Sequence, residues 1–295
     1  MQIGAVVRLG PVVEGEQPPR FAAIRDMACR MEDVGLDSIW VYDHLLYRWP
    51  GRPTDGIWEC WTALSALAQA THRVQLGTLV LCTPFRNPAV LAKMATTLDE
   101  VSGGRLTLGL GAGWHQPEFD AFGVPFDHRA SRFQEALEII CPLLRTGHVD
   151  FQGTYHAAPD CEIIPRRPRP AGPPIMLAGS GPRMQRLAAR YADSWNTAWH
   201  TEPASANARL DSIRAACALE SRDPNSLAIT AAVGIGYPDL GPVTARAGLT
   251  GTPERVAEAF RGYAALGVAH IIIEFAPYTT AALDRLADAV RLFRG

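Results

Sequence analysis

The chain has 295 residues, of which 47% are hydrophobic and 20% are charged. This balance is typical of a soluble globular protein, and the length suffices for one large domain. The 28 basic and 30 acidic residues leave a net charge of −2, which argues against a partner that is a nucleic acid or an anionic membrane. No apolar run approaches the roughly 20 residues that a transmembrane helix requires.

The N-terminal residues and the cysteines indicate the cellular compartment in which we expect the protein. The start, from Met1 to Val7, lacks the basic segment and the small-residue cleavage site of a secretory signal peptide. The six cysteines are widely spaced and include no Cys-x-x-Cys pair, so the sequence predicts neither a zinc site nor a disulfide framework. We therefore expect a cytoplasmic protein without a metal site.

Short apolar runs alternate with segments of helical periodicity along most of the chain. The runs are apolar throughout, which is typical of parallel strands covered on both faces. Between them, apolar residues recur at helical spacing within 21–34, 133–144 and 256–263. Gly35 and Gly267 follow two of these segments and are expected to end the helices. The predicted strands are 3–7, 38–42, 74–81, 106–110, 175–178, 193–197, 228–235 and 270–275.

Eight strands, each followed by a helix and joined without a linker, predict a (β/α)8 TIM barrel that forms a single domain over residues 1–295. A doubly wound open sheet remains the alternative. The proline-rich stretch 148–174 breaks the alternation and predicts an insertion before the fifth strand. In such a barrel the chemistry lies on the loops that follow the carboxyl ends of the strands.

Asp43 and His44 directly follow the second predicted strand. A carboxylate and an imidazole at that position can orient a ligand and move a proton, because the imidazole titrates near neutral pH. The alternative is a charged turn without a function. We expect these two residues to be catalytic.

Two glycine-containing segments follow later strands. The spacing of Gly109, Gly111 and Gly113 is not that of a dinucleotide-binding fingerprint. It predicts a backbone that a flat ring can approach closely. Trp114 and His115 follow and are expected to project into the mouth of the barrel, at the carboxyl ends of the strands. The segment Gly179-Ser180-Gly181 joins a strand to a helix, whose free N–H groups suit a phosphate. An ordinary tight turn is the alternative for the second segment.

Other candidates have structural alternatives of equal weight. Trp49 and Trp58 are expected to line an apolar substrate cavity, although tryptophans at such spacing are often part of a core. Cys82 is expected to be a structural thiol, because nothing nearby lowers its pKa. Arg129 and the arginine-rich stretch that includes Arg169 are expected to face solvent.

Six ordered segments resemble the bacterial luciferase-like superfamily, and together they cover nearly the whole chain. The chain is most similar to the branch of F420-dependent oxidoreductases. The resemblance implies a (β/α)8 barrel that binds reduced FMN or the deazaflavin F420 in its mouth, commonly as a homodimer. The segments are 34–44, 77–88, 97–105, 108–123, 178–182 and 189–196.

The resemblance also assigns roles to residues. It places Asp43 and His44 beside the reactive face of the isoalloxazine, and Leu79-Val80 at a strand bulge where members often hold a non-proline cis peptide behind the ring. Matching positions that would contact the cofactor are Ala112 and Gly113 at the border of the ring, and Gly179, Ser180 and Gly181 at its phosphate.

One departure from the family pattern concerns the substrate. Trp114 stands where the sugar-phosphate dehydrogenases of the family carry a glutamate, which implies a more apolar substrate than a sugar phosphate. Glu118 is expected to lie one helical turn too far away to replace that glutamate.

Three functions follow from this resemblance. The first is an F420-dependent oxidoreductase that transfers hydride to or from a small, apolar organic substrate, with His44 as proton donor or acceptor and Asp43 orienting it. The second is a two-component monooxygenase that uses molecular oxygen and reduced FMN from a separate reductase. The third is a non-catalytic flavin-binding protein. Arg183, Arg186 and Arg190 would suit the acidic tail of F420, or could simply solvate a helix.

Overall fold

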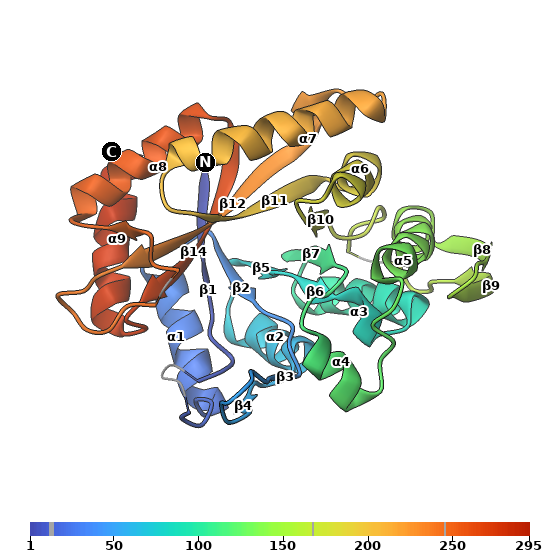
Figure 1. Ribbon diagram of the computed structural model, residues 1–295, viewed down its shortest axis with the longest axis horizontal. Coiled ribbons are helices and arrows are strands. Elements are labelled where there is room, and N and C mark those ends of the chain that lie inside the picture. Colours follow the sequence, from blue (N-terminus) through green and yellow to red (C-terminus); the bar gives the residue numbers. More distant parts are fainter. Residues whose placement is uncertain (12–14, 167, 245) are drawn as a thin grey trace.

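The computed structural model describes residues 1–11, 15–166, 168–244 and 246–295. Eight parallel strands form a barrel, which closes because β7 pairs with β10 as well as with β5 (Figure 1). The (β/α)8 barrel is therefore confirmed and the open sheet is wrong. In their order around the barrel, the strands are β1 (Gln2–Val6), β2 (Ser38–Val41), β5 (Gln75–Thr78), β7 (Leu106–Gly111), β10 (Ile175–Ala178), β11 (Ser194–His200), β12 (Ala228–Gly236) and β14 (Val268–Ala276).

Helices cover the outside of the barrel, and local chemistry fixes where several of them begin and end. The Glu59 carboxylate accepts hydrogen bonds from the first N–H groups of α2, and the Asn87 side chain does the same for α3. Gly35 and Gly267 follow helices at φ of 91° and 85°, as expected for helix terminators. The helices are α1 (Phe21–Asp33), α2 (Cys60–Ala70), α3 (Pro88–Val101), α4 (Gln116–Phe122), α5 (Arg129–Arg145), α6 (Pro182–Tyr191), α7 (Asn207–Leu219), α8 (Pro253–Ala265) and α9 (Thr280–Arg294).

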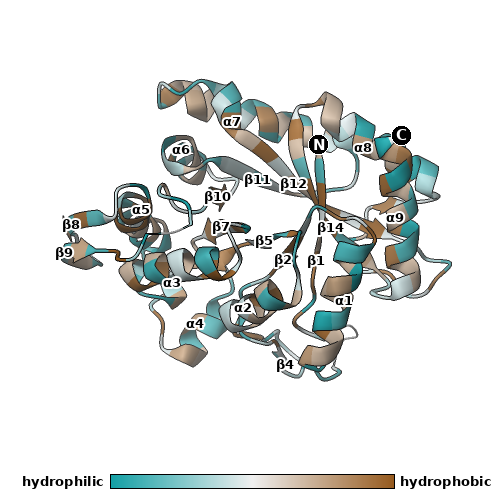
Figure 2. Cartoon of the chain, turned by 180° about the vertical axis from the view of Figure 1, so that it is seen from behind, coloured by the Kyte–Doolittle hydropathy of each residue, from teal (hydrophilic) through white to brown (hydrophobic). Residues whose placement is uncertain are grey.

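The core has two parts. The larger part lies between the strands and the helices, and in Figure 2 the helices show both hydrophobic and hydrophilic residues along their length, as this arrangement requires. The smaller part fills the inside of the barrel, and partly buried side chains pack against it. Its buried members are Val6, Trp40, Leu79, Met176, Ala232 and Ile272, and the partly buried ones are Tyr42, Val80, Ala198 and Trp199.

Additional short strands lie outside the eight strands of the barrel. β3 (Leu46–Tyr47) and β4 (Asp55–Gly56) pair antiparallel in the loop after β2, β6 (Leu81–Cys82) pairs with β7, and β13 (Leu249–Thr250) pairs with β12. The predicted insertion contains an antiparallel hairpin, β8 (His148–Gln152) and β9 (Ala157–Glu162), which projects from the right-hand edge of Figure 1.

The expectation that Arg129 and Arg169 face solvent is wrong. Arg169 forms an ion pair with the buried Asp99 and donates to the carbonyl oxygen of Leu106 at 2.6 Å. Arg129 donates to the carbonyl oxygen of Gly113 at 2.6 Å. Both guanidinium groups supply donors to acceptors that would otherwise be left unpaired in the protein.

None of the helices in the described part of the chain is both long and apolar enough to cross a membrane. Among the same residues, no three potential metal ligands of the His, Cys, Asp or Glu type gather in one place.

Candidate active site

His44 lies at the carboxyl end of β2, and its partner is a carboxylate. Its Nδ1 lies 2.9 Å from Oε1 of Glu118, whose Oε2 accepts a hydrogen bond of 2.9 Å from the backbone N–H of Leu45. The Glu118 side chain is 1% exposed and that of His44 is 13% exposed. Glu118 reaches His44 because α4 begins directly after His115 and turns its side chain back toward β2. That Glu118 lies too far away to replace the glutamate of the sugar-phosphate dehydrogenases stays a prediction.

The Asp43 carboxylate binds β6 and Arg86 rather than this pair, and so connects the loops at the mouth of the barrel. One of its carboxylate oxygens accepts hydrogen bonds from the Cys82 backbone N–H at 2.8 Å and from Nη1 of Arg86 at 2.6 Å. Arg86 also contacts the other carboxylate oxygen at 3.1 Å and Glu59, at the start of α2, at 2.5 Å. Both carboxylate oxygens of Asp43 are thus engaged by β6 and Arg86, and the carboxylate that contacts the His44 ring is that of Glu118.

A small cavity of about 140 Å³ brings several predicted residues together. The Leu79–Val80 peptide bond on its wall is cis, as the resemblance implied. Burial raises the pKa of the Cys82 thiol, so this wall stays uncharged. The lining comprises Asp43, His44, Leu79, Val80, Leu81, Cys82, Gly113, Trp114 and Glu118.

Gly113 occupies a position that only glycine fits. Its φ is +75°, and a Cβ there would lie 2.5 Å from Phe119 and 2.6 Å from the Cys82 sulfur. The backbone at Gly113 therefore packs directly against Phe119 and Cys82. That a flat ring lies against this backbone stays a prediction.

Aromatic rings surround His44 on the side that faces away from Asp43. The ring centroids of Tyr47 and Trp114 lie 4.5 and 5.6 Å from that of His44. His115 is buried beside Trp49, with 4.7 Å between the ring centroids, and its Nε2 accepts a hydrogen bond from the backbone N–H of Arg48 at 3.1 Å. Burial lowers the pKa of His115, so this histidine is a packed, neutral member of the cluster.

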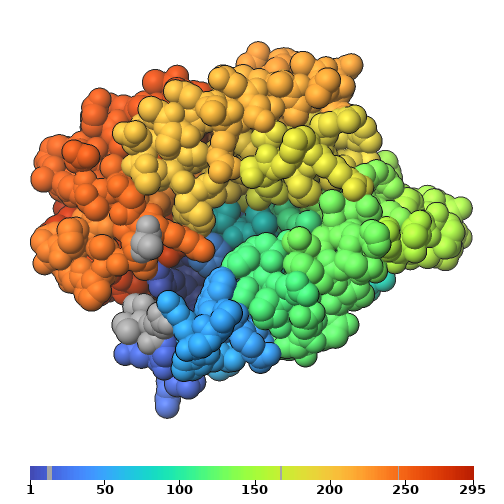
Figure 3. Space-filling model, in the orientation of Figure 1, coloured from blue at the N-terminus to red at the C-terminus, as the bar shows by residue number. Residues whose placement is uncertain are grey.

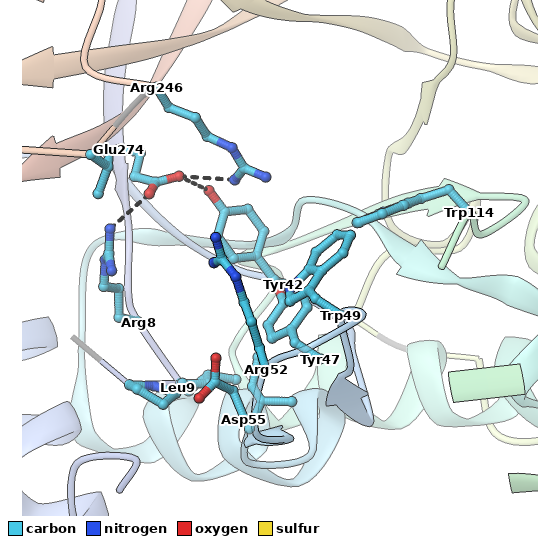
Figure 4. Close-up of a pocket in the computed structure, with 14 residues that line it drawn as sticks. Arg8, Leu9, Tyr42, Tyr47, Trp49, Arg52, Asp55, Trp114, Arg246 and Glu274 are labelled. Carbon is cyan, nitrogen blue, oxygen red and sulfur yellow. Dashed lines mark hydrogen bonds and ion pairs between the residues drawn. The ribbon is translucent and has the colours of Figure 1, made fainter. Parts of the chain in front are cut away.

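A second cavity, of about 370 Å³, opens beyond Trp114 and is lined partly by charged residues. Glu274 on β14 accepts hydrogen bonds from Arg8 at 2.8 Å, from the Tyr42 hydroxyl at 2.7 Å and from Arg246 at 3.3 Å (Figure 4). Burial and the adjacent Glu274 raise the pKa of Tyr42 well above its usual value, so this hydroxyl keeps its proton. Figure 3 shows the surface hollowed between the light-blue, green and yellow segments of the chain.

The predicted phosphate site lies at the same end of the barrel, after β10. Gly181 caps α6, Pro182 is the first helical residue, and a Cβ added at Gly181 would meet nothing within 4 Å. The rim arginines of α6 have protein partners: Arg183 donates to Ser131 and Gln134, whereas Arg186 and Arg190 both pair with Glu220.

The structure does not bring every predicted residue to the mouth. Trp58 lies apart, in an apolar groove with Phe21, and its indole N–H donates to the Pro19 carbonyl oxygen at 2.8 Å. The hairpin of β3 and β4 turns the chain back between Trp49 and Trp58, which separates the two tryptophans. Ala112 lines neither of the two cavities, and neither does His115, which is 3% exposed and packs behind Trp49 instead of projecting into the mouth.

Sequence reasoning missed four residues of the mouth. Glu274 carried a signal, because it is the one acidic residue in the apolar run 270–275. Arg86 follows the third predicted strand closely, so the sequence could have indicated an ion pair with Asp43 at the end of the neighbouring second strand. Arg8 follows the first strand in the same way, whereas Arg246 lies in a long loop without any pattern.

The sequence profile of the luciferase-like monooxygenase family matches residues 1–236. The fold and the sequence together define the class: the chain belongs to the luciferase-like monooxygenase family.

Two relatives are similar in sequence. An F420-dependent glucose-6-phosphate dehydrogenase of Amycolatopsis mediterranei is 37% identical over 175 residues, which are 58% of this chain and 51% of the relative. A phthiodiolone/phenolphthiodiolone dimycocerosates ketoreductase of Mycobacterium tuberculosis is 32% identical over 244 residues, which are 76% of this chain and 63% of the relative. The matches therefore span between half and two thirds of the length of these relatives.

Two solved structures share the fold. An F420-dependent secondary alcohol dehydrogenase in complex with an F420-acetone adduct aligns with a TM-score of 0.81 and 20% identity over 100% of this chain and 99% of its own. An EDTA monooxygenase from Chelativorans sp. BNC1 aligns with a TM-score of 0.81 and 14% identity over 100% and 94% of the two chains. At these identities the similarity shows the fold alone.

Proposed function

We propose that the protein is an F420-dependent oxidoreductase that transfers hydride between the deazaflavin and a small organic substrate. The observation that carries the proposal is His44, held by the buried Glu118 and exposed to a small cavity at the carboxyl end of the barrel. The F420 dependence of the glucose-6-phosphate dehydrogenase relative supports this choice of cofactor.

The residues of the cavity fit a flat, largely apolar ring. Leu79, Val80 and the backbone at Gly113 present aliphatic and peptide surface, with His44 as the polar group beside them. Gly179, Ser180 and Gly181 would hold the phosphate at the start of α6, where free N–H groups favour an anion. When bound, the deazaflavin supplies or accepts a hydride.

His44 would move the accompanying proton. A carboxylate can only accept hydrogen bonds, so the contact with Glu118 places the imidazole proton on Nδ1. The lone pair is then on Nε2, which can take the hydroxyl proton of an alcohol as its carbon is oxidised, or return a proton when a carbonyl compound is reduced. Glu118 orients the ring and selects this tautomer.

The substrate would lie between His44 and the aromatic wall. Trp49 and Trp114 offer apolar surface to its carbon skeleton, as the apolar substrate expected from the sequence requires. A family described as monooxygenases favours a second candidate, a two-component enzyme that uses reduced FMN and molecular oxygen. A non-catalytic flavin-binding protein is the third, and a homodimer and a separate cofactor reductase belong to the proposal as partners.

A titration of the purified protein with F420, FMN and reduced FMN under argon, followed by fluorescence, separates the candidates. We expect F420 to bind with micromolar or tighter affinity and both FMN forms to bind much more weakly. Preferential binding of reduced FMN would support the monooxygenase instead, and binding of none of them would contradict both enzymes. Hydride transfer would then be assayed with F420 on a panel of alcohols from 2-propanol to 4-(hydroxymethyl)benzoate, and with reduced F420 on the matching carbonyl compounds.

A further inference from the structure

The second cavity of the mouth carries an excess of positive charge. Among the described residues that line it, three are arginines, Arg8, Arg52 and Arg246, and two are acids, Asp55 and Glu274. The excess of positive charge that matters here lies at Arg8 and Arg246, which share the single carboxylate of Glu274. A cavity of this kind favours a ligand with a single negative charge.

The two arginines on Glu274 have hydrogen-bonding capacity beyond it. Arg8 and Arg246 approach the carboxylate from different sides (Figure 4). Within the described part of the chain, the side chain of each makes one hydrogen bond, to Glu274, although a guanidinium carries five N–H donors. The Arg8 side chain lines the cavity and is 15% exposed.

The charged end of this cavity is connected to His44 through aromatic residues. Trp114 lines both cavities, and Tyr47 lines the larger one while its ring lies 4.5 Å from that of His44. Trp49 completes the aromatic wall, with 5.9 Å between its ring centroid and that of Trp114. A single ligand could therefore place an apolar body along this wall, with one end toward His44 and the other toward the arginines.

We propose that Arg8 and Arg246 form an anion subsite for a carboxylate of the substrate, whose apolar body packs against Trp49 and Trp114. The inference rests on the proposed function and deepens it, because it assigns the substrate to the class of apolar alcohols or carbonyl compounds that bear a carboxylate at the far end. A guanidinium matches a carboxylate through two parallel N–H donors, which makes arginine the suitable residue here.

Isothermal titration of the protein with 4-(hydroxymethyl)benzoate and with 4-(hydroxymethyl)benzamide tests the subsite without any turnover. The two probes share the same body and differ in charge. We expect the acid to bind at least about tenfold more tightly than the amide, and Arg246→Gln to reduce this preference to less than about threefold. Arg246→Lys should retain part of the preference, because it keeps the charge but not the fork of donors.

Two further variants sharpen the test. Glu274→Gln removes the competing carboxylate, so it should bind the acid more tightly than wild type and leave the affinity for the amide unchanged. Arg261→Gln on α8 is the matched control, since Arg261 is also half-exposed and paired with a glutamate but lies outside the mouth. It should leave both affinities unchanged.

The outcomes distinguish this inference from the proposed function. Equal affinity of the wild-type protein for acid and amide would overturn the anion subsite, even if F420 binds and turnover is observed. A loss of F420 affinity in Arg246→Gln with an intact acid preference would also overturn it, because the arginines would then serve the cofactor. A preference for the acid that Arg246→Gln abolishes, with the F420 affinity unchanged, supports the subsite.

Discussion

Each end of the barrel places a histidine ring against a tryptophan ring. At the carboxyl end the rings of His44 and Trp114 meet edge to face with 5.6 Å between centroids, and at the amino end Trp40 and His270 do so at 5.5 Å. The two histidines differ in the partner of their ring. His44 contacts the carboxylate of Glu118, whereas Nε2 of His270 lies 2.8 Å from the hydroxyl of Ser38.

Because their partners and surroundings differ, we expect His44 to take part in the reaction and His270 to contribute only to stability. Burial lowers the pKa of His270 to about 4, and the cavity of about 260 Å³ that it lines lies at the amino end of the barrel, with Gln2 and Gln75 at the starts of β1 and β5. Ser38 joins the two rings at this end, because its hydroxyl also accepts a hydrogen bond from the indole N–H of Trp40. His44 has a carboxylate that fixes its tautomer and a cavity in front of it, the two conditions that proton transfer requires.

The largest expected effect comes from the same substitution made at each end. His44→Gln should lower kcat for the fastest alcohol of the panel by about 10²–10⁴-fold, because it removes the proton acceptor. His270→Gln should leave kcat within about threefold of wild type, because its ring does not face the mouth. Steady-state kinetics together with F420 titration of both variants checks this. Equal turnover of wild type and His44→Gln would contradict the catalytic role of His44.

The second prediction concerns stability against acid. In the unfolded chain His270 takes up a proton near pH 6.5, whereas in the folded protein it does so only at about pH 4. The unfolded state therefore binds more protons in this interval, so the contribution of His270 to stability is complete above pH 6.5 and falls as the pH decreases toward 4. The loss amounts to about 3 kcal/mol.

Urea unfolding at several pH values measures this loss. The difference in unfolding free energy between wild type and His270→Gln should shrink by about 3 kcal/mol between pH 7 and pH 4. His44→Gln serves as the comparison at the other end of the barrel. A difference between wild type and His270→Gln that does not change with pH would show that His270 is not held neutral.

The smallest of the three effects is expected for Glu118→Gln. The Leu45 N–H keeps the amide oxygen as its acceptor, so the amide N–H₂ faces His44 and moves the imidazole proton to Nε2. This tautomer cannot accept a proton at Nε2, and kcat should fall by about ten- to a hundredfold with KM unchanged. Nitrogen-15 NMR of the His44 ring reports the tautomer directly. A fall in kcat without a change of tautomer would reduce Glu118 to a packing residue.

Much of the barrel could be predicted because the signals are local. Each strand is a short apolar run between helical segments, and the strand-to-loop transition at Asp43 placed His44 at the reactive end without any tertiary information. The glycine at position 113 is needed for a reason that the sequence did not indicate, because the chain there packs against Cys82 and Phe119. The resemblance located the cis peptide at Leu79–Val80, which no local pattern in the sequence indicates.

What could not be predicted depends on pairs that are distant in sequence. Glu118 reaches His44 across 74 positions, and Arg8 reaches Glu274 across 266. Such pairs form only when the barrel closes, so the orienting partner of His44 was assigned to its sequence neighbour Asp43 instead. Trp49 and Trp58 illustrate the opposite case. They are close in sequence, but the hairpin of β3 and β4 separates them in space.

Trp114 is the wall that the two cavities of the mouth share, and its indole is 53% exposed. It therefore acts as a partition whose size sets the distance between the reacting carbon and the charged end of a ligand. A smaller side chain at this position would merge the cavities into one chamber and admit branched molecules, whereas the indole admits slender ones. A single substitution at Trp114 would therefore change the range of accepted ligands without any change in the barrel strands.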